Sequence, residues 1–104
     1  MKFIQIQTTI DSQKKAQKIA KVMVEEKLAG CVQIVGPIES IYQWKGKIEK
    51  AKEYLLLIKT KETLYKKVEA RIKILHTYET PEIIAVPIVR GSKGYLEWLK
   101  ASTN

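Results

Sequence analysis

The sequence predicts an α+β fold in which two helices cover one face of a four-stranded antiparallel sheet. Three observations support this fold class. Four segments carry strand-like apolar patterns, two others repeat apolar residues at helical spacing, and the segments follow the order β-α-β-β-α-β. This order is that of a ferredoxin-like sheet, and a short helix is expected to end the chain. With 104 residues, 45% of them hydrophobic, residues 1–104 are expected to form one domain.

The first strand and the first helix are predicted from the start of the chain. Residues 2–9 alternate apolar and polar side chains, as expected for a half-buried strand. Asp11 or Ser12 can then accept a hydrogen bond from a free amide at the helix N-terminus. Gly30 is expected to adopt the left-handed conformation that ends the helix. The apolar positions of this helix are Ala16, Ile19, Ala20, Met23 and Leu28.

A long β-hairpin is predicted next. Cys31–Trp44 forms one strand, with a bulge or an edge at Pro37 because proline cannot donate to a ladder. Lys45-Gly46 is the expected tip, since glycine tolerates positive φ. Residues 47–59 return, and their run at 54–58 is apolar on both faces. That run predicts a central strand covered above and below.

The second helix, the last strand and a terminal helix follow. Thr60 is the expected N-cap of a helix that ends near His76, with apolar positions at Leu64, Val68, Ile72 and Leu75. Thr80-Pro81 requires extended backbone before the proline, and residues 82–89 form the fourth strand. A turn at 91–94 leads to a short helix carrying Tyr95, Leu96, Trp98 and Leu99.

The arms of the hairpin are about twice as long as the first and last strands. They must overhang their own sheet, and a lone two-stranded ribbon is only marginally stable in water. Pairing with other copies in a closed ring would cover the exposed ribbon and its free edges. The alternative is that the hairpin folds back over its own sheet. The predicted subunit interface comprises Tyr42, Trp44, Ile41 and Ile48. Tyr42 and Trp44 share one face of the strand, where they could instead stack on a ligand.

Composition restricts the classes of partner. The chain has 19 Lys+Arg against 11 Asp+Glu, a formal net charge of +8, and all its arginines are Arg71 and Arg90. The lysines are spread along the chain, which indicates a solvated surface rather than a nucleic-acid site. No apolar run is long enough to span a membrane. Cys31 has no partner for an internal disulfide, which favours a reducing compartment, and we expect the cytoplasm.

Several motifs together resemble those of the divalent-cation tolerance (CutA) family. They are Leu28-Ala29-Gly30-Cys31-Val32, Ser40-Ile41-Tyr42-Gln43-Trp44-Lys45-Gly46-Lys47-Ile48, Glu53, Lys59-Thr60, His76-Thr77-Tyr78-Glu79-Thr80-Pro81-Glu82-Ile83-Ile84 and Tyr95-Leu96-Glu97-Trp98-Leu99. The match runs in order along nearly the whole chain. The resemblance implies a ferredoxin-like homotrimer with interlocked hairpins, an assembly similar to that of PII signalling proteins. It also implies a role in tolerance to copper and other divalent cations.

The chain departs from the family pattern at several positions. Thr77 stands where the family usually has proline, and Gln33 where it usually has asparagine. Some members of the family are credited with a copper site made by a cysteine that ends the first strand and by paired histidines. The matching positions here hold Thr8, Leu75 and His76. Only His76 could keep that role.

The candidate metal ligands are His76, Cys31, Glu79 and Glu82, and Glu53 is a further candidate oxygen ligand or acid. Copper prefers several thiolate or imidazole ligands, so one cysteine and one histidine require a site shared between subunits. Each residue also has a structural explanation: Cys31 as a small buried side chain, His76 as a partner of a helix-end carbonyl, and the glutamates, with Glu53, as turn or surface carboxylates.

No catalytic motif is present, and no enzyme or organic cofactor is predicted. Cys31 and His76 lie on different elements with no evident third group to orient them. Two functions remain open. The first is a trimeric metal-response protein that binds divalent cations weakly, copper among them. The second is a PII-like signalling or scaffold trimer whose inter-subunit clefts bind a small anion or a partner protein, suggested by Lys45, Lys47 and Lys59 and the aromatic residues beside Ser40.

Overall fold

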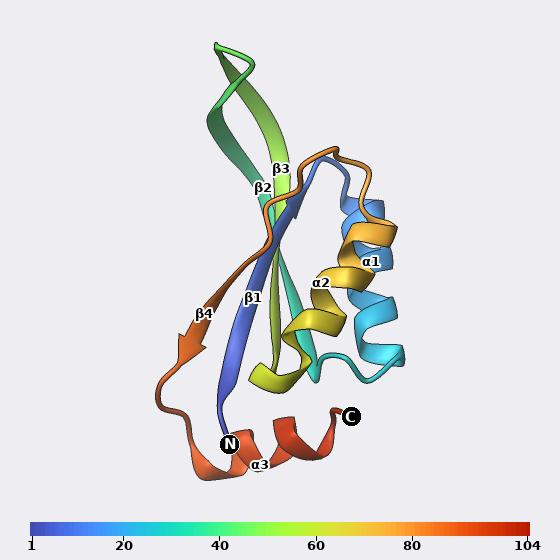
Figure 1. Cartoon of the computed structure of the whole chain (residues 1–104), viewed down its shortest axis with the longest axis vertical. Coiled ribbons are helices and arrows are strands. Elements are labelled where there is room, and N and C mark those ends of the chain that lie inside the picture. The colour runs from blue at the N-terminus through green and yellow to red at the C-terminus, as the bar shows by residue number, and fades with distance from the viewer.

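The structure is a computed structural model that describes residues 1–104 (Figure 1). Its elements are β1 (Phe3–Ile10), α1 (Gln13–Glu25), β2 (Cys31–Trp44), β3 (Lys47–Lys61), a 3₁₀ turn (Glu62–Leu64), α2 (Tyr65–Leu75), β4 (Ile84–Ile88) and α3 (Lys93–Ala101). The sheet is antiparallel with strand order β2-β3-β1-β4. The predicted α+β, ferredoxin-like arrangement is confirmed. None of the helices is both long and apolar enough to cross a membrane.

The core lies between the sheet and the pair α1 and α2, which pack on one side of it (Figure 1). Strand periodicity sends alternate side chains of β1 and β3 into this core. Ile6 faces Ile58 across the two strands, and both are fully buried. Helical spacing adds Ile19 from α1 and Ile72 from α2 to the same cluster. The two observed periods therefore build one continuous core.

Two predicted roles at helix ends are wrong. Ser12 caps α1 as predicted, accepting a hydrogen bond from the Lys15 amide, but the left-handed residue after α1 is Lys27, with φ 57°, and not Gly30. A Cβ on Gly30 would lie 2.6 Å from Leu99 Cδ1. The missing side chain of Gly30 therefore lets α3 pack closely against this part of the chain. Thr60 is the second wrong prediction. It is a buried residue of β3, and its hydroxyl donates to the Leu28 carbonyl at 2.6 Å.

The hairpin extends beyond the rest of the sheet, as predicted. β1 pairs with residues 54–61 of β3, so residues 47–53 pair with β2 alone. The ladder shifts register between Val35 and Ile38, which confirms the predicted irregularity at Pro37. Lys45 and Gly46 both have positive φ at the tip. The hairpin projects away from the helices and does not fold back over its own sheet (Figure 1). The molecule measures 45 × 25 × 23 Å.

The face of the sheet opposite α1 and α2 is largely open in this single chain. β3 is an inner strand of the sheet, as predicted. Within one protomer, however, the helices cover only one of its faces, so the predicted cover on both faces is wrong for a single chain. The apolar side chains on this open face of the sheet include the exposed Val35 of β2 and the exposed Ile84 and Val86 of β4. α3 lies across the end of the sheet farthest from the hairpin tip (Figure 1). Two edge strands, β2 and β4, and one apolar face thus remain uncovered.

Candidate functional site

A groove of about 820 Å³ lies where the hairpin leaves the sheet. Three segments line it: the hairpin, the end of β1 with the turn after it, and the loop between α2 and β4. Four carboxylates contribute to the lining, from Asp11, Glu53, Glu79 and Glu82, and no lysine or arginine does. In a chain of net charge +8, this groove is therefore locally acidic.

His76 anchors the loop of the groove to β1. Its Nε2 lies 2.8 Å from the Thr9 carbonyl oxygen, and its Nδ1 accepts the Tyr78 amide at 3.1 Å. A carbonyl can only accept, so Nε2 carries the proton and the ring is neutral in this arrangement. The side chain is buried, and its ring packs edge-on to Tyr78 with centroids 4.6 Å apart. His76 thus binds a strand carbonyl instead of a carbonyl at the end of its own helix.

Tyr78 connects this anchor to Glu53. Its hydroxyl donates to Glu53 Oε2 at 2.7 Å. Burial, and then the hydrogen bond and charge of Glu53, raise the pKa of Tyr78 well above its ordinary value. Glu53 is only 5% exposed and forms no ion pair. The Tyr78 hydroxyl thus holds the carboxylate of the buried Glu53 in the wall of the groove.

The predicted metal ligands are not brought together within one protomer. Glu79 and Glu82 line the groove, and both are exposed. Cys31 pairs with Lys59 at one end of β3, whereas Thr9, the partner of His76, pairs with Leu55. Burial, and then the neighbouring Cys31, raise the pKa of Tyr95. No three histidine, cysteine, aspartate or glutamate side chains gather in a cluster that could hold a metal ion.

The four predicted interface residues lie on two faces of the hairpin. Tyr42 pairs with Glu49 and Trp44 with Lys47, so these aromatic residues share the face that lines the groove. Ile41 and Ile48 lie on the opposite face, where they are 61% and 74% exposed, although Ile41 also borders the groove.

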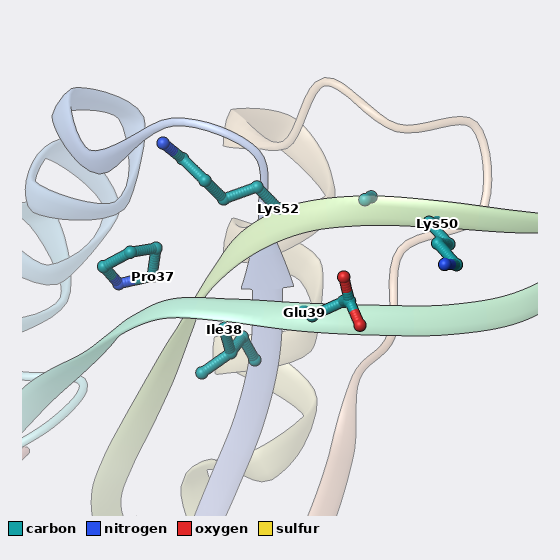
Figure 2. A pocket seen from close by; sticks show the side chains of 6 residues that line it. Pro37, Ile38, Glu39, Lys50 and Lys52 are labelled. Atoms are coloured by element: carbon teal, nitrogen blue, oxygen red, sulfur yellow. The ribbon is translucent and has the colours of Figure 1, made fainter.

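A second hollow of about 340 Å³ lies beside the bulge of the hairpin (Figure 2). Figure 2 shows the side chains of Ile38 and Glu39 pointing to opposite sides of the ribbon. Lys50 and Lys52 complete its charged lining. No buried polar group lies in this hollow, so the larger groove is the better candidate for a functional site.

Sequence reasoning identified the glutamates of the groove but missed Asp11 and the role of Tyr78. Asp11 follows β1, Glu53 lies on β3 and Tyr78 follows α2. Their common location results from the pairing of β1 beside β3, which single-sequence patterns do not give. The Tyr78 motif was visible in the sequence, but its partner Glu53 stands 25 residues earlier.

A sequence model described as "CutA1 divalent ion tolerance protein" matches residues 4–102. The chain belongs to the CutA1 family. The divalent-cation tolerance protein CutA of Thermus thermophilus is 46% identical over 95 residues, which cover 91% of this chain and 92% of that protein. The chloroplastic protein CutA of Arabidopsis thaliana is 45% identical over 100 residues, and the match covers 96% of this chain but 55% of the plant protein.

Solved structures of the CutA1 family have the same fold. The crystal structure of CutA1 from Oryza sativa superimposes with a TM-score of 0.97 at 42% sequence identity, covering all of this chain and 95% of the rice chain. The match therefore includes the long hairpin as well as the helices and the sheet.

Proposed function

We propose that this CutA1-family chain is a homotrimeric divalent-cation tolerance protein that contacts metal ions weakly and catalyses no reaction. Membership of a family named for divalent-ion tolerance is the observation that carries the role. The absence of catalysis is supported by the position of Cys31 far along the sheet from His76, and by the two hydrogen bonds that occupy the His76 ring.

The uncovered surfaces of the protomer support the assembly. β2 and β4 are the free edges on opposite sides of one sheet. If β2 of each copy pairs with β4 of the next copy, a closed ring results. Exposed apolar side chains follow these edges: Val35 on β2, Ile84 and Val86 on β4, and Ile41 and Ile48 on the hairpin. The family resemblance supplies the number of three copies.

Light scattering on the eluting protein tests the assembly. A particle three times the mass of the 12.0 kDa protomer is expected. Replacing Ile41 and Ile48 by lysine should shift the protein toward smaller species, because each added charge would be buried at the contact between subunits. A stable protomer-sized particle at micromolar concentration would contradict the proposal.

Weak metal contact is assigned to the exposed carboxylates at the rim of the groove. Glu79 and Glu82 are accessible oxygen donors on one short loop. His76 would have to break a hydrogen bond to Thr9 or Tyr78 before it could bind a metal. Cys31 of one protomer could contribute only at a contact with another copy.

Calorimetric titration with copper and zinc tests this assignment. The heats should fall in the double variant Glu79→Gln, Glu82→Gln and stay unchanged in Cys31→Ser. The matched control is Glu25→Gln, Glu97→Gln, which removes the same charge from exposed helix positions. Equal heats in the rim variant and the control would reject the rim as the contact.

A further inference from the structure

The charge of the groove is opposite to that of the chain as a whole. None of Glu53, Glu79 and Glu82 forms an ion pair, and Asp11 contacts only Lys15, at 3.9 Å. The lysines that suggested an anion site do not line the groove. Lys59 lies elsewhere on the sheet, where its ammonium donates to the Gln33 side chain. A ligand of this groove is therefore expected to be positive.

Glu53 provides a second, independent reason to expect a cation. It is the buried acid of the groove, and its carboxylate has one hydrogen-bond donor, the Tyr78 hydroxyl on Oε2. The other carboxylate oxygen, Oε1, accepts no hydrogen bond from the chain, and it is not among the side-chain atoms that are buried without a partner. Oε1 is therefore open to the groove, and a carboxylate oxygen can accept further hydrogen bonds. A cation that enters the groove can donate to this free position.

Aromatic side chains make the groove better suited to an organic cation than to an inorganic one. Tyr42 and Trp44 lie on its hairpin wall and Tyr78 on its loop wall. Aromatic faces attract ammonium groups, and Trp44 already has the Lys45 ammonium 5.6 Å from its ring centroid. The groove volume of about 820 Å³ suits a small molecule with an apolar body.

We propose that the groove binds a small organic cation, a primary amine with an apolar or aromatic body. Its ammonium group donates to Glu53, and its body lies between Tyr42 and Trp44. His76 acts as a positioning residue, because its hydrogen bonds to Thr9 and Tyr78 hold the loop that orients Glu53. This binding is independent of metal contact at Glu79 and Glu82, and it requires only that the groove stays open in the oligomer.

Tyramine is a suitable probe, with 4-ethylphenol as its neutral counterpart and 3-(4-hydroxyphenyl)propanoate as its anionic one. Calorimetry on the full-length oligomer should show tyramine binding about tenfold or more tightly than 4-ethylphenol, since hydrogen bonds to charged groups are strong. The anion should give no heat. Equal affinity for the amine and the neutral phenol, tighter binding of the anion, or no tyramine binding would overturn the proposal.

Two sets of variants locate the site. Glu53→Gln should weaken tyramine binding about tenfold, whereas the control Glu97→Gln on α3 should not change it. If Glu53→Gln does not fold, the double variant Glu79→Gln, Glu82→Gln should still weaken tyramine a few-fold by removing nearby charge, and Glu25→Gln, Glu97→Gln should not. Unchanged affinity in the groove variants rejects the site. Loss of the oligomer in a folded Glu53→Gln also rejects it, because a neighbouring copy would then be the cation donor. A failed copper titration leaves the tyramine result unaffected.

Discussion

Replacing Thr8 by valine should stabilise the protein, because the structure buries the Thr8 hydroxyl without a partner. The side chain is 0% exposed, faces the core beside Leu56, and its Oγ1 has no hydrogen bond. An unpaired buried hydroxyl costs about 1–3 kcal/mol. Valine keeps the β-branched shape and leaves no cavity. The free energy of unfolding should therefore rise by about 1–2 kcal/mol per protomer.

Thr60 offers a matched control on the same face of the sheet. It is also 0% exposed, but its hydroxyl donates to the Leu28 carbonyl at 2.6 Å. Thr60→Val removes that bond and leaves the carbonyl without this donor. The same chemical change should therefore lower the free energy of unfolding by about 1–2 kcal/mol.

Denaturant unfolding followed by circular dichroism can compare the two variants with the parent. Protein concentration must be equal in all samples, because subunit association contributes to apparent stability. The expected order of midpoints is Thr8→Val, then parent, then Thr60→Val. A Thr8→Val midpoint at or below that of the parent would refute the reasoning, since it would show that Thr8 has a hydrogen-bond partner, such as a buried water.

Two further predictions concern Tyr78 and the glycines near α3. The folded state retains the Tyr78 proton where the unfolded chain loses it, so stability should be full below about pH 10 and fall as pH rises above it. Tyr78→Phe should lower the free energy of unfolding by about 2 kcal/mol at neutral pH, because it removes the hydrogen bond to Glu53. In urea titrations this variant should lose less stability than the parent as the pH rises above about 10. An unchanged dependence of stability on pH would count against this role of Tyr78. Gly30→Ala should lower the free energy of unfolding by about 1–3 kcal/mol, because the added Cβ would clash with Leu99. In the same assay, Gly94→Ala should be neutral or stabilising by less than about 1 kcal/mol, because a Cβ at Gly94 would meet nothing within 4 Å. Equal effects of the two alanines would contradict the packing role of Gly30.

Local patterns sufficed for the features that depend on local backbone physics. The positive φ values at Lys45 and Gly46 follow from the steric freedom of glycine in a tight turn, and the irregular ladder at Pro37 from its missing amide. Helix ends were less predictable. Lys27, directly after the C-cap of α1, takes the left-handed conformation, whereas Gly30 is required by the close approach of Leu99 from α3. A pattern cannot distinguish a glycine required by its φ from one required by a neighbour.

The candidate site could be predicted only in part, because its residues meet through the sheet topology. The sequence identified Glu53, Glu79 and Glu82 as possible acids but gave no reason to place Asp11 beside them. The antiparallel pairing of β1 with β3 sets Ile10 opposite Tyr54, and this brings the turn after β1 next to Glu53. Likewise, the net charge of +8 is an average that conceals an acidic groove.

The positions that the resemblance associates with copper also show why metal contact should use different donors in this chain. Thr8 faces the closed core, so even a cysteine there would lie among apolar side chains on the helix-covered face of the sheet. His76 is buried with both ring nitrogens hydrogen-bonded, and its removal would release the Tyr78 loop before it removed a ligand. A loss of metal response in a His76 variant therefore needs a structural readout beside it. Because His76 supports Tyr78, and Tyr78 supports Glu53, such a variant should also lose tyramine binding, whereas a rim variant that loses copper should weaken it only a few-fold.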